Sequence, residues 1–138
     1  MTSKRRLILL DNTSLVGKIK ASKMPYYDNK ARTIKFKARP VLILKAERDS
    51  GNSDFTVLPI SSVSFQQNIN KSFDLEVTKK AYSLLNLTKD ICYIRCGKIM
   101  TLNKSDLATS TISDLRGEYP ELWASILEKV NLYISTIK

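Results

Sequence analysis

Apolar residues of this chain recur at every second position in several segments up to about residue 102, and at every third or fourth position near its end. The longest segment covers residues 34–45, where Ile34, Phe36 and Ala38 alternate with basic residues before the apolar run VLIL. Alternation is typical of a strand with one face in water, and a continuous run is typical of burial on both faces. The sequence therefore predicts one long strand that begins at a basic, solvent-facing rim and ends in the core.

Shorter segments with strand character lie at residues 17–21, 55–60, 73–77 and 91–102. We expect Pro59 to break the segment at 55–60, because proline cannot donate to a ladder, and Gly97 to divide or bend the last one. Residues 25–31 (PYYDNKA) are rich in turn formers and predict a long exposed loop, and residues 47–54 predict a turn. Ser61 and Ser62 lie where the strand at 55–60 ends.

From Lys104 onward the apolar period becomes that of a helix. Apolar residues at three- and four-residue steps run from Leu122 to Ile137, and Pro120 suits a first helical turn. We expect a helix over residues 120–137 and a shorter helical segment near residues 105–115. Strands first and helix last predict the α+β class, with a small antiparallel β-barrel and a C-terminal helix.

The chain has 138 residues, a length that favours one domain with one core. We divide residues 1–138 into an N-terminal arm or short helix at 1–16, the barrel at 17–102 and a helical part at 103–138. No apolar run approaches the ~20 residues of a membrane span, and the first apolar stretch is too short for a secretory signal. We therefore expect a cytoplasmic protein without a membrane partner.

Histidine is absent, which excludes a Ser-His-Asp or Cys-His pair and any histidine general base. The two cysteines, Cys92 and Cys96, are too few for a disulfide scaffold or a closed zinc site, so we expect no metal and no cofactor. Their spacing of four residues in a strand-like segment predicts that both face the core. Trp123 lies at the centre of the helical period and is expected to face the core or a second copy of the chain.

The formal net charge is +10, and residues 1–40 carry eleven Lys or Arg against two Asp. Clustered cations raise the local potential and attract anionic partners, either nucleic acid or an acidic protein segment. A solvated surface that promotes solubility is the alternative explanation.

Three segments in this order, ARPVLIL at 38–44, VLPISS at 57–62 and YIRCGKIMTLNKSDL at 93–107, resemble the PemK/MazF family of bacterial toxins. The opening VGKIKASKMPY is similar to the first strand and loop of that family. The resemblance implies an SH3-like barrel and a sequence-specific, metal-independent endoribonuclease that cuts single-stranded RNA. It also implies a homodimer and a cognate antitoxin, which we expect to be an acidic, partly disordered segment.

The resemblance implies that Arg39 and Ser61 are catalytic. Attack of a ribose 2′-OH on the adjacent phosphorus gathers negative charge on the phosphoryl oxygens, and a guanidinium can clamp these oxygens in fork geometry. A guanidinium stays protonated, so we do not expect Arg39 to act as the base. Donation of a proton from Arg39 to the 5′ leaving group is an alternative role. Ser61 is expected to donate a hydrogen bond to the same phosphate. The expected products are a 2′,3′-cyclic phosphate and a 5′-hydroxyl end.

Several relatives carry a glutamate base before the arginine, but residues 17–38 here contain only Asp28 as a carboxylate. Asp28, Glu47 or a lysine with a lowered pKa beside Lys35 and Lys37 are the candidates for the base. The residues expected to bind RNA are Tyr26, Tyr27, Lys35, Lys37, Ser62 and Arg95. The two tyrosines stack on bases or pack on the barrel, and Arg95, on the opposite parity from the cysteines, is a candidate second phosphate contact.

Two other functions fit the same sequence. CcdB-like toxins share the fold and bind DNA gyrase without catalysis, and a small basic barrel can be an RNA-binding module. The discriminating feature is whether Arg39 and Ser61 converge, with Ser61 accessible.

Overall fold

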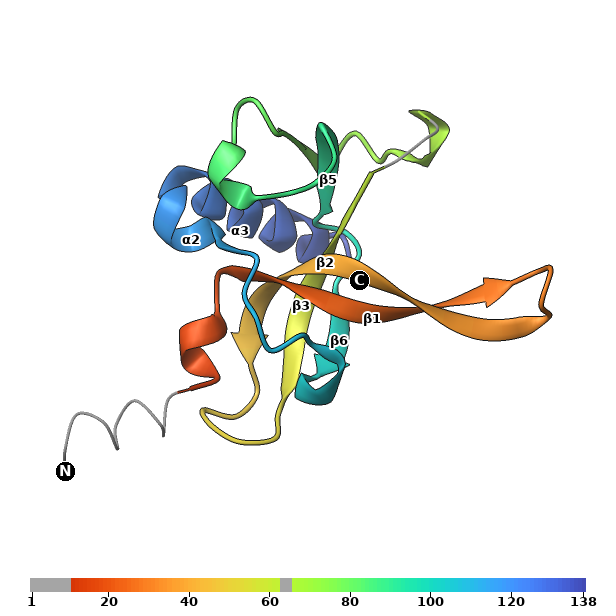
Figure 1. The fold of residues 1–138 in the computed structure, drawn as a ribbon. Coiled ribbons are helices and arrows are strands. Elements are labelled where there is room, and N and C mark those ends of the chain that lie inside the picture. Colours follow the sequence, from red (N-terminus) through yellow and green to blue (C-terminus); the bar gives the residue numbers. More distant parts are fainter. Residues whose placement is uncertain (1–10, 63–65) are drawn as a thin grey trace.

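The computed structural model describes residues 11–62 and 66–138 (Figure 1). Most of the predicted N-terminal arm, residues 1–10, lies outside this part of the chain, and Thr13–Leu15 forms a single 3-10 turn. The strands are β1 (Lys18–Asp28), β2 (Thr33–Ala46), β3 (Asp54–Ser61), β4 (Asp74–Thr78), β5 (Ile91–Arg95), β6 (Met100–Asn103) and β7 (Ser113–Asp114). The α-helices are α2 (Leu115–Glu118) and α3 (Pro120–Ser135).

All strand pairs are antiparallel, and the sheet has the order β4-β5-β3-β2-β1-β7 with β6 also paired to β3. One edge of β3 is therefore shared between two strands, β6 along its first half and β5 at its end. This change of partner curls the sheet, and α3 packs across it (Figure 1). The molecule is a small α+β protein with a curled antiparallel sheet and a C-terminal helix, as the change of apolar period predicted.

The main core lies between the sheet and α3. Leu42, Leu58 and Ile94 of the sheet meet Leu122 and Ile126 of the helix in one buried cluster. Each such side chain contributes about 1.5–3 kcal/mol when it is fully buried, so this contact holds the helix on the sheet. Cys92 and Cys96 are buried in the same cluster as unpaired thiols, which confirms the prediction from their spacing.

A second cluster packs on the other side of β2 and β3. It contains Val41, Ile43, Phe55, Val57 and Leu102, all buried. The apolar run predicted to be covered on both faces is therefore covered by two different cores. Trp123 is partly buried against the main cluster, with the Arg116 guanidinium carbon 5.6 Å from the centre of its ring.

The prediction of a long exposed loop at residues 25–31 is wrong. β1 continues to Asp28, and ten register pairs join it to β2 up to Asp28–Thr33. The turn formers around Pro25 are overridden because the alternating partner strand supplies a ladder along the whole length. Only the tip turns, where Arg32 has a positive φ of 54°. The result is a two-stranded ribbon that extends beyond the rest of the sheet (Figure 1).

Pro59 does not break β3, contrary to expectation. It pairs in register with Val41 of β2, and on its other edge it falls between the stretch paired to β6 and the stretch paired to β5. The missing N–H is therefore not required by a strand on that edge. The segment at 91–102 does form two strands around Gly97, but both pair with β3 and not with each other.

The prediction of a short helical segment near residues 105–115 is also wrong. This segment contains a 3-10 turn at Lys104–Asp106, then extended chain, β7 and the short α2. The backbone N–H groups of Ala108 and Ile112 donate to the carbonyls of Ala21 and Ile19 at 2.9 and 2.8 Å. The segment thus satisfies the free edge of β1, and its many serines and threonines disfavour a helix. Within the described residues, no helix is long and apolar enough to span a membrane.

Candidate functional site

The site lies where β2 and β3 emerge from the core. The ladder between β2 and β3 ends at the pair Val41–Pro59, and Arg39 and Ser61 each lie two residues beyond this pair on their own strands. Residues at matching positions of antiparallel strands project to the same face. Arg39 is the residue before Pro40 and the buried run, and Ser61 is the last residue of β3. Both are partly exposed to solvent.

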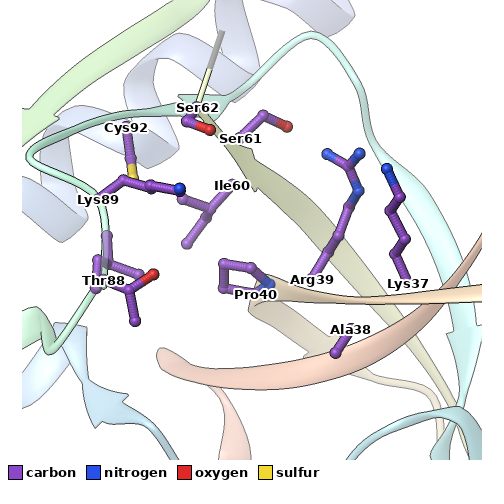
Figure 2. A pocket seen from close by; sticks show the side chains of 11 residues that line it. Lys37, Ala38, Arg39, Pro40, Ile60, Ser61, Ser62, Thr88, Lys89 and Cys92 are labelled. Atoms are coloured by element: carbon purple, nitrogen blue, oxygen red, sulfur yellow. The ribbon is translucent and has the colours of Figure 1, made fainter.

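A pocket of about 260 Å³ opens at this place (Figure 2). Figure 2 shows Lys37 and Arg39 on one wall, the two serines at the strand exit beside them, and Thr88 and Lys89 on the wall across the pocket. The lining residues are Lys37, Ala38, Arg39, Pro40, Ile60, Ser61, Ser62, Leu87, Thr88, Lys89 and Cys92. Arg39 and Ser61 therefore converge on one space, and Ser61 is accessible there.

The electrostatic character of the pocket is positive. Lys37, Arg39 and Lys89 line it, and the lining residues include neither aspartate nor glutamate. Three cations beside three hydroxyl groups suit an anion with several acceptor oxygens, such as a phosphodiester. The arrangement can hold and polarise a phosphate.

Cys92 lines the pocket with a neutral thiol. Burial raises the pKa of this thiol above its ordinary value of 9.0, while the neighbouring Lys89 acts in the opposite direction. At neutral pH it is therefore protonated and behaves as a small apolar surface. Cys96 lies deeper, and burial raises the pKa of its thiol to about 11.

The predicted RNA-binding residues of the ribbon are divided between its two faces. Tyr26 lies on the face of Lys37 and Arg39, and the Lys37 ammonium sits 4.6 Å from the centre of the Tyr26 ring. Tyr27 lies on the other face and is 59% exposed, so it does not pack on the sheet. Lys35 is ion-paired at 3.0 Å with Asp28 and is not among the residues that line the pocket.

Arg95 is not part of the pocket, and the structure does not support it as a second phosphate contact. Its Nε donates to Asp74 Oδ1 at 3.2 Å, and its terminal nitrogen donates to the Asn68 carbonyl at 3.0 Å. The Asp74 side chain is only 1% exposed and also accepts the backbone N–H of Asn70. This ion pair fastens the segment that leads into β4.

Lys89 was missed by sequence reasoning. It lies in the connection between β4 and β5, where the sequence Thr88-Lys89-Asp90 carries no motif. Only the packing of this connection against the end of β3 brings it to the pocket.

Neither carboxylate proposed as the base reaches the pocket. Asp28 lies at the tip of the ribbon, six residues along β1 from Ser22, the partner of Arg39, which is about 20 Å of strand. The Ala31 backbone N–H and Lys35 hold its pKa below the ordinary value of 3.8. Glu47 follows the opposite end of β2 and lines a different depression with Lys45.

Among the described residues there is no group of three or more histidine, cysteine, aspartate or glutamate side chains placed to hold a metal ion. Comparisons of the sequence with known protein families and with curated proteins found no match.

Proposed function

We propose that this protein is a sequence-specific endoribonuclease toxin that cuts single-stranded RNA without a metal, with an SH3-like barrel of the PemK/MazF kind. The observation that carries the proposal is the convergence of Arg39 and Ser61 on one cationic pocket at the exit of two paired strands. These are the two residues that the resemblance singles out, and they are 22 positions apart in the chain.

The proposed reaction is attack of a ribose 2′-oxygen on the adjacent phosphorus. The new P–O2′ bond forms as the P–O5′ bond breaks, the 2′-OH loses its proton, and the departing O5′ gains one. Arg39 offers parallel N–H donors to the phosphoryl oxygens that become more negative, and Ser61 donates a hydroxyl hydrogen bond that fixes the in-line geometry. Lys37 and Ser62 add positive charge and a further donor at the same phosphate.

The RNA strand is proposed to leave the pocket along the basic face of the ribbon. Lys35, Lys37 and Arg39 follow one another on this face of β2, and Tyr26 lies beside Lys37. Aromatic rings beside cations hold unpaired bases by stacking and phosphates by charge. The ribbon extends away from the sheet (Figure 1). An RNA segment bound along it therefore leaves room for the rest of a long RNA molecule.

A homodimer and a cognate acidic antitoxin belong to the same proposal. The exposed apolar residues of the ribbon and the net charge of +10 are compatible with partners that supply apolar and acidic surface. A disordered acidic segment that folds onto the basic face would compete directly with RNA.

A non-catalytic RNA-binding module is the second candidate, and one observation favours it. Within residues 11–62 and 66–138, none of the residues that line the pocket carries a carboxylate, so no described general base of that type stands beside Arg39. Binding of an acidic surface of DNA gyrase is a third use of the same cationic face.

The test is incubation of the purified protein with mixed-sequence RNA in EDTA, followed by mapping of the ends. We expect cleavage at defined sites, 5′-hydroxyl ends and 2′,3′-cyclic phosphates or their 3′-phosphate hydrolysis products. RNA binding without cleavage would favour the binding module. Cleavage that leaves 3′-hydroxyl ends or is lost in EDTA would contradict the proposed chemistry.

A further inference from the structure

The proposed phosphate chemistry uses only one wall of the pocket. Arg39, Lys37 and Ser61 serve it, whereas Thr88 and Lys89 come from the β4–β5 connection and point into the pocket from the opposite wall (Figure 2). Both of these side chains end in hydrogen-bond donors. A cation and a hydroxyl facing the phosphate wall across an open space are placed to contact a second part of the same ligand.

The space between the two walls has an apolar lining. Pro40, Ile60, Leu87 and the neutral thiol of Cys92 contribute to it. The pocket volume of about 260 Å³ is slightly below the ~300 Å³ at the lower end of small-molecule sites. A planar, partly apolar ring of single-base size fits these conditions, since an unstacked base needs an apolar surface and hydrogen bonds at its edge.

We propose that this half of the pocket is a subsite for an unstacked base next to the scissile phosphate, and that it selects a keto base, guanine or uracil. The proposal rests on the endoribonuclease function and names a determinant of its sequence specificity. Lys89 is the specificity residue and Thr88 supports it.

The selection follows from the donors available. An ammonium group has three N–H donors and no acceptor, so it favours an edge that carries carbonyl oxygen or ring nitrogen acceptors. Guanine offers O6 and N7, and uracil offers carbonyl oxygens. Adenine and cytosine place an exocyclic amino group at the corresponding position, which leaves two donors facing each other. The Thr88 hydroxyl can donate or accept a hydrogen bond, so it can contact either a keto or an amino base. It therefore adds to the preference for keto bases less than Lys89 does.

The first experiment maps cleavage sites in a randomised RNA in EDTA. We expect guanine and uracil to be enriched about ten-fold over adenine and cytosine at one position flanking the cut, which corresponds to about 1.4 kcal/mol. Lys89→Met keeps an unbranched side chain of nearly the same length and removes the charge, and it should reduce this preference to two-fold or less. Thr88→Val should reduce it by a smaller factor.

The matched control is Lys80→Met, which removes the same charge from an exposed position on the same connection but outside the pocket. It should keep the wild-type preference. A wild-type protein that cuts without a keto preference, or a Lys89→Met variant that keeps the full preference, would overturn the subsite.

The second experiment measures binding without catalysis. Cys92 lines the pocket and is 5% exposed, so its alkylation by a small haloacetamide at alkaline pH, where its thiol begins to ionise, reports access to the pocket. Mass spectrometry follows the reaction, and Cys96, which is 0% exposed, serves as the internal reference. Guanosine and uridine 3′-monophosphates should slow alkylation of Cys92 in the wild type more than adenosine and cytidine 3′-monophosphates do. Lys89→Met should remove the difference.

The two experiments separate the two proposals. A protein that cuts no RNA but is protected selectively by keto nucleotides keeps the subsite and loses the nuclease. A protein that cuts RNA but shows equal protection by all four nucleotides, or none, keeps the nuclease and loses the subsite.

Discussion

The two ends of the β1–β2 hairpin have the same backbone pairing and opposite environments. In the half within the sheet, Ile19 pairs with Leu42 and both are 0% exposed, whereas near the tip Tyr27 pairs with Ile34 at 59% and 63% exposed. Strand alternation puts Ile34, Phe36 and Leu42 on the same side of β2. The apolar side of β2 is therefore covered by α3 in the body of the protein. Near the tip, the described residues leave the same side exposed to solvent.

This difference teaches that one repeating pattern serves two purposes. In the body the pattern provides core, and its loss costs folding free energy. In the ribbon the pattern gives a strand with one basic and one apolar face, both facing solvent, and its loss should cost little folding free energy. Arg39 lies at the boundary, with exposed ribbon on one side and buried strand on the other.

The largest expected effect tests the buried half. Leu42→Ala should lower the free energy of unfolding by about 2–5 kcal/mol, because it removes buried atoms and leaves a cavity between the sheet and α3. Ile34→Ala on the same side of the same strand should change it by about 0.5 kcal/mol or less. Urea denaturation of both variants measures the contrast. A comparable loss for Ile34→Ala that shrinks as the protein is diluted would mean that a second copy covers the ribbon, because stabilisation by a bound partner falls with protein concentration.

The next effect concerns the boundary. Arg39→Ala should reduce RNA cleavage by about 10²–10³, the effect of removing one pre-aimed transition-state donor, without changing the unfolding midpoint. Arg39→Lys should recover little, because an ammonium lacks the planar two-pronged grip on phosphate. Ser61→Ala should cost less than Arg39→Ala, and Ser61→Thr should remain active.

Single-turnover cleavage rates on one defined RNA measure this series. A nearly wild-type Arg39→Lys variant would show that only net charge matters at the pocket, and the proposed clamp would be rejected.

These features differ in how far the sequence predicted them. The long strand and α3 followed from period alone, since apolar spacing reports directly which side of an element is covered. The convergence of Arg39 and Ser61 on one pocket followed from two segments whose strands are adjacent in the chain. The ribbon did not, because the turn formers around Pro25 state a local preference that a ladder with β2 outweighs.

The positions of two further residues, Lys89 and Arg95, could not be predicted from the sequence for another reason. Lys89 enters the pocket from a connection whose position depends on how β4 and β5 pack, and no local pattern records that. Arg95 was predicted to be a candidate phosphate contact because its parity is opposite to that of the buried cysteines. The buried carboxylate of Asp74, twenty-one positions earlier, binds it instead.

A smaller effect distinguishes the two faces of the ribbon. Tyr26→Ala should weaken binding of a single-stranded RNA oligonucleotide by about 1–3 kcal/mol, the value of one base–aromatic stack, since Tyr26 lies on the face of Lys37 and the pocket. Tyr27→Ala, the adjacent tyrosine on the opposite face, is the matched control and should have little effect. Fluorescence anisotropy at fixed salt measures both. Equal losses would place RNA on the apolar face as well.

The smallest effect concerns the tip of the ribbon and its dependence on pH. Asp28 accepts hydrogen bonds from the backbone N–H groups of Lys30 and Ala31 at 2.9 and 3.1 Å and pairs with Lys35, and these donors lower its pKa in the folded chain. A carboxyl whose folded pKa is depressed contributes its stabilisation fully above its ordinary pKa, 3.8 for Asp28, and loses it as the pH falls through the lower folded value.

The backbone amides of Lys30 and Ala31 should therefore be protected from hydrogen exchange by the carboxylate at neutral pH and lose this protection in the acid range, while amides of β3 stay protected. Asp28→Asn keeps an acceptor oxygen but removes the charge, so protection of the tip should be lower at neutral pH and should not fall further on acidification. Because the side chain is partly exposed and lies at the tip of the ribbon, the unfolding midpoint of the whole protein should hardly change. If the amides of β3 lost protection together with those of the tip on acidification, the ribbon and the body would unfold as one cooperative unit. The two ends of the hairpin would then differ in solvent exposure but not in local stability.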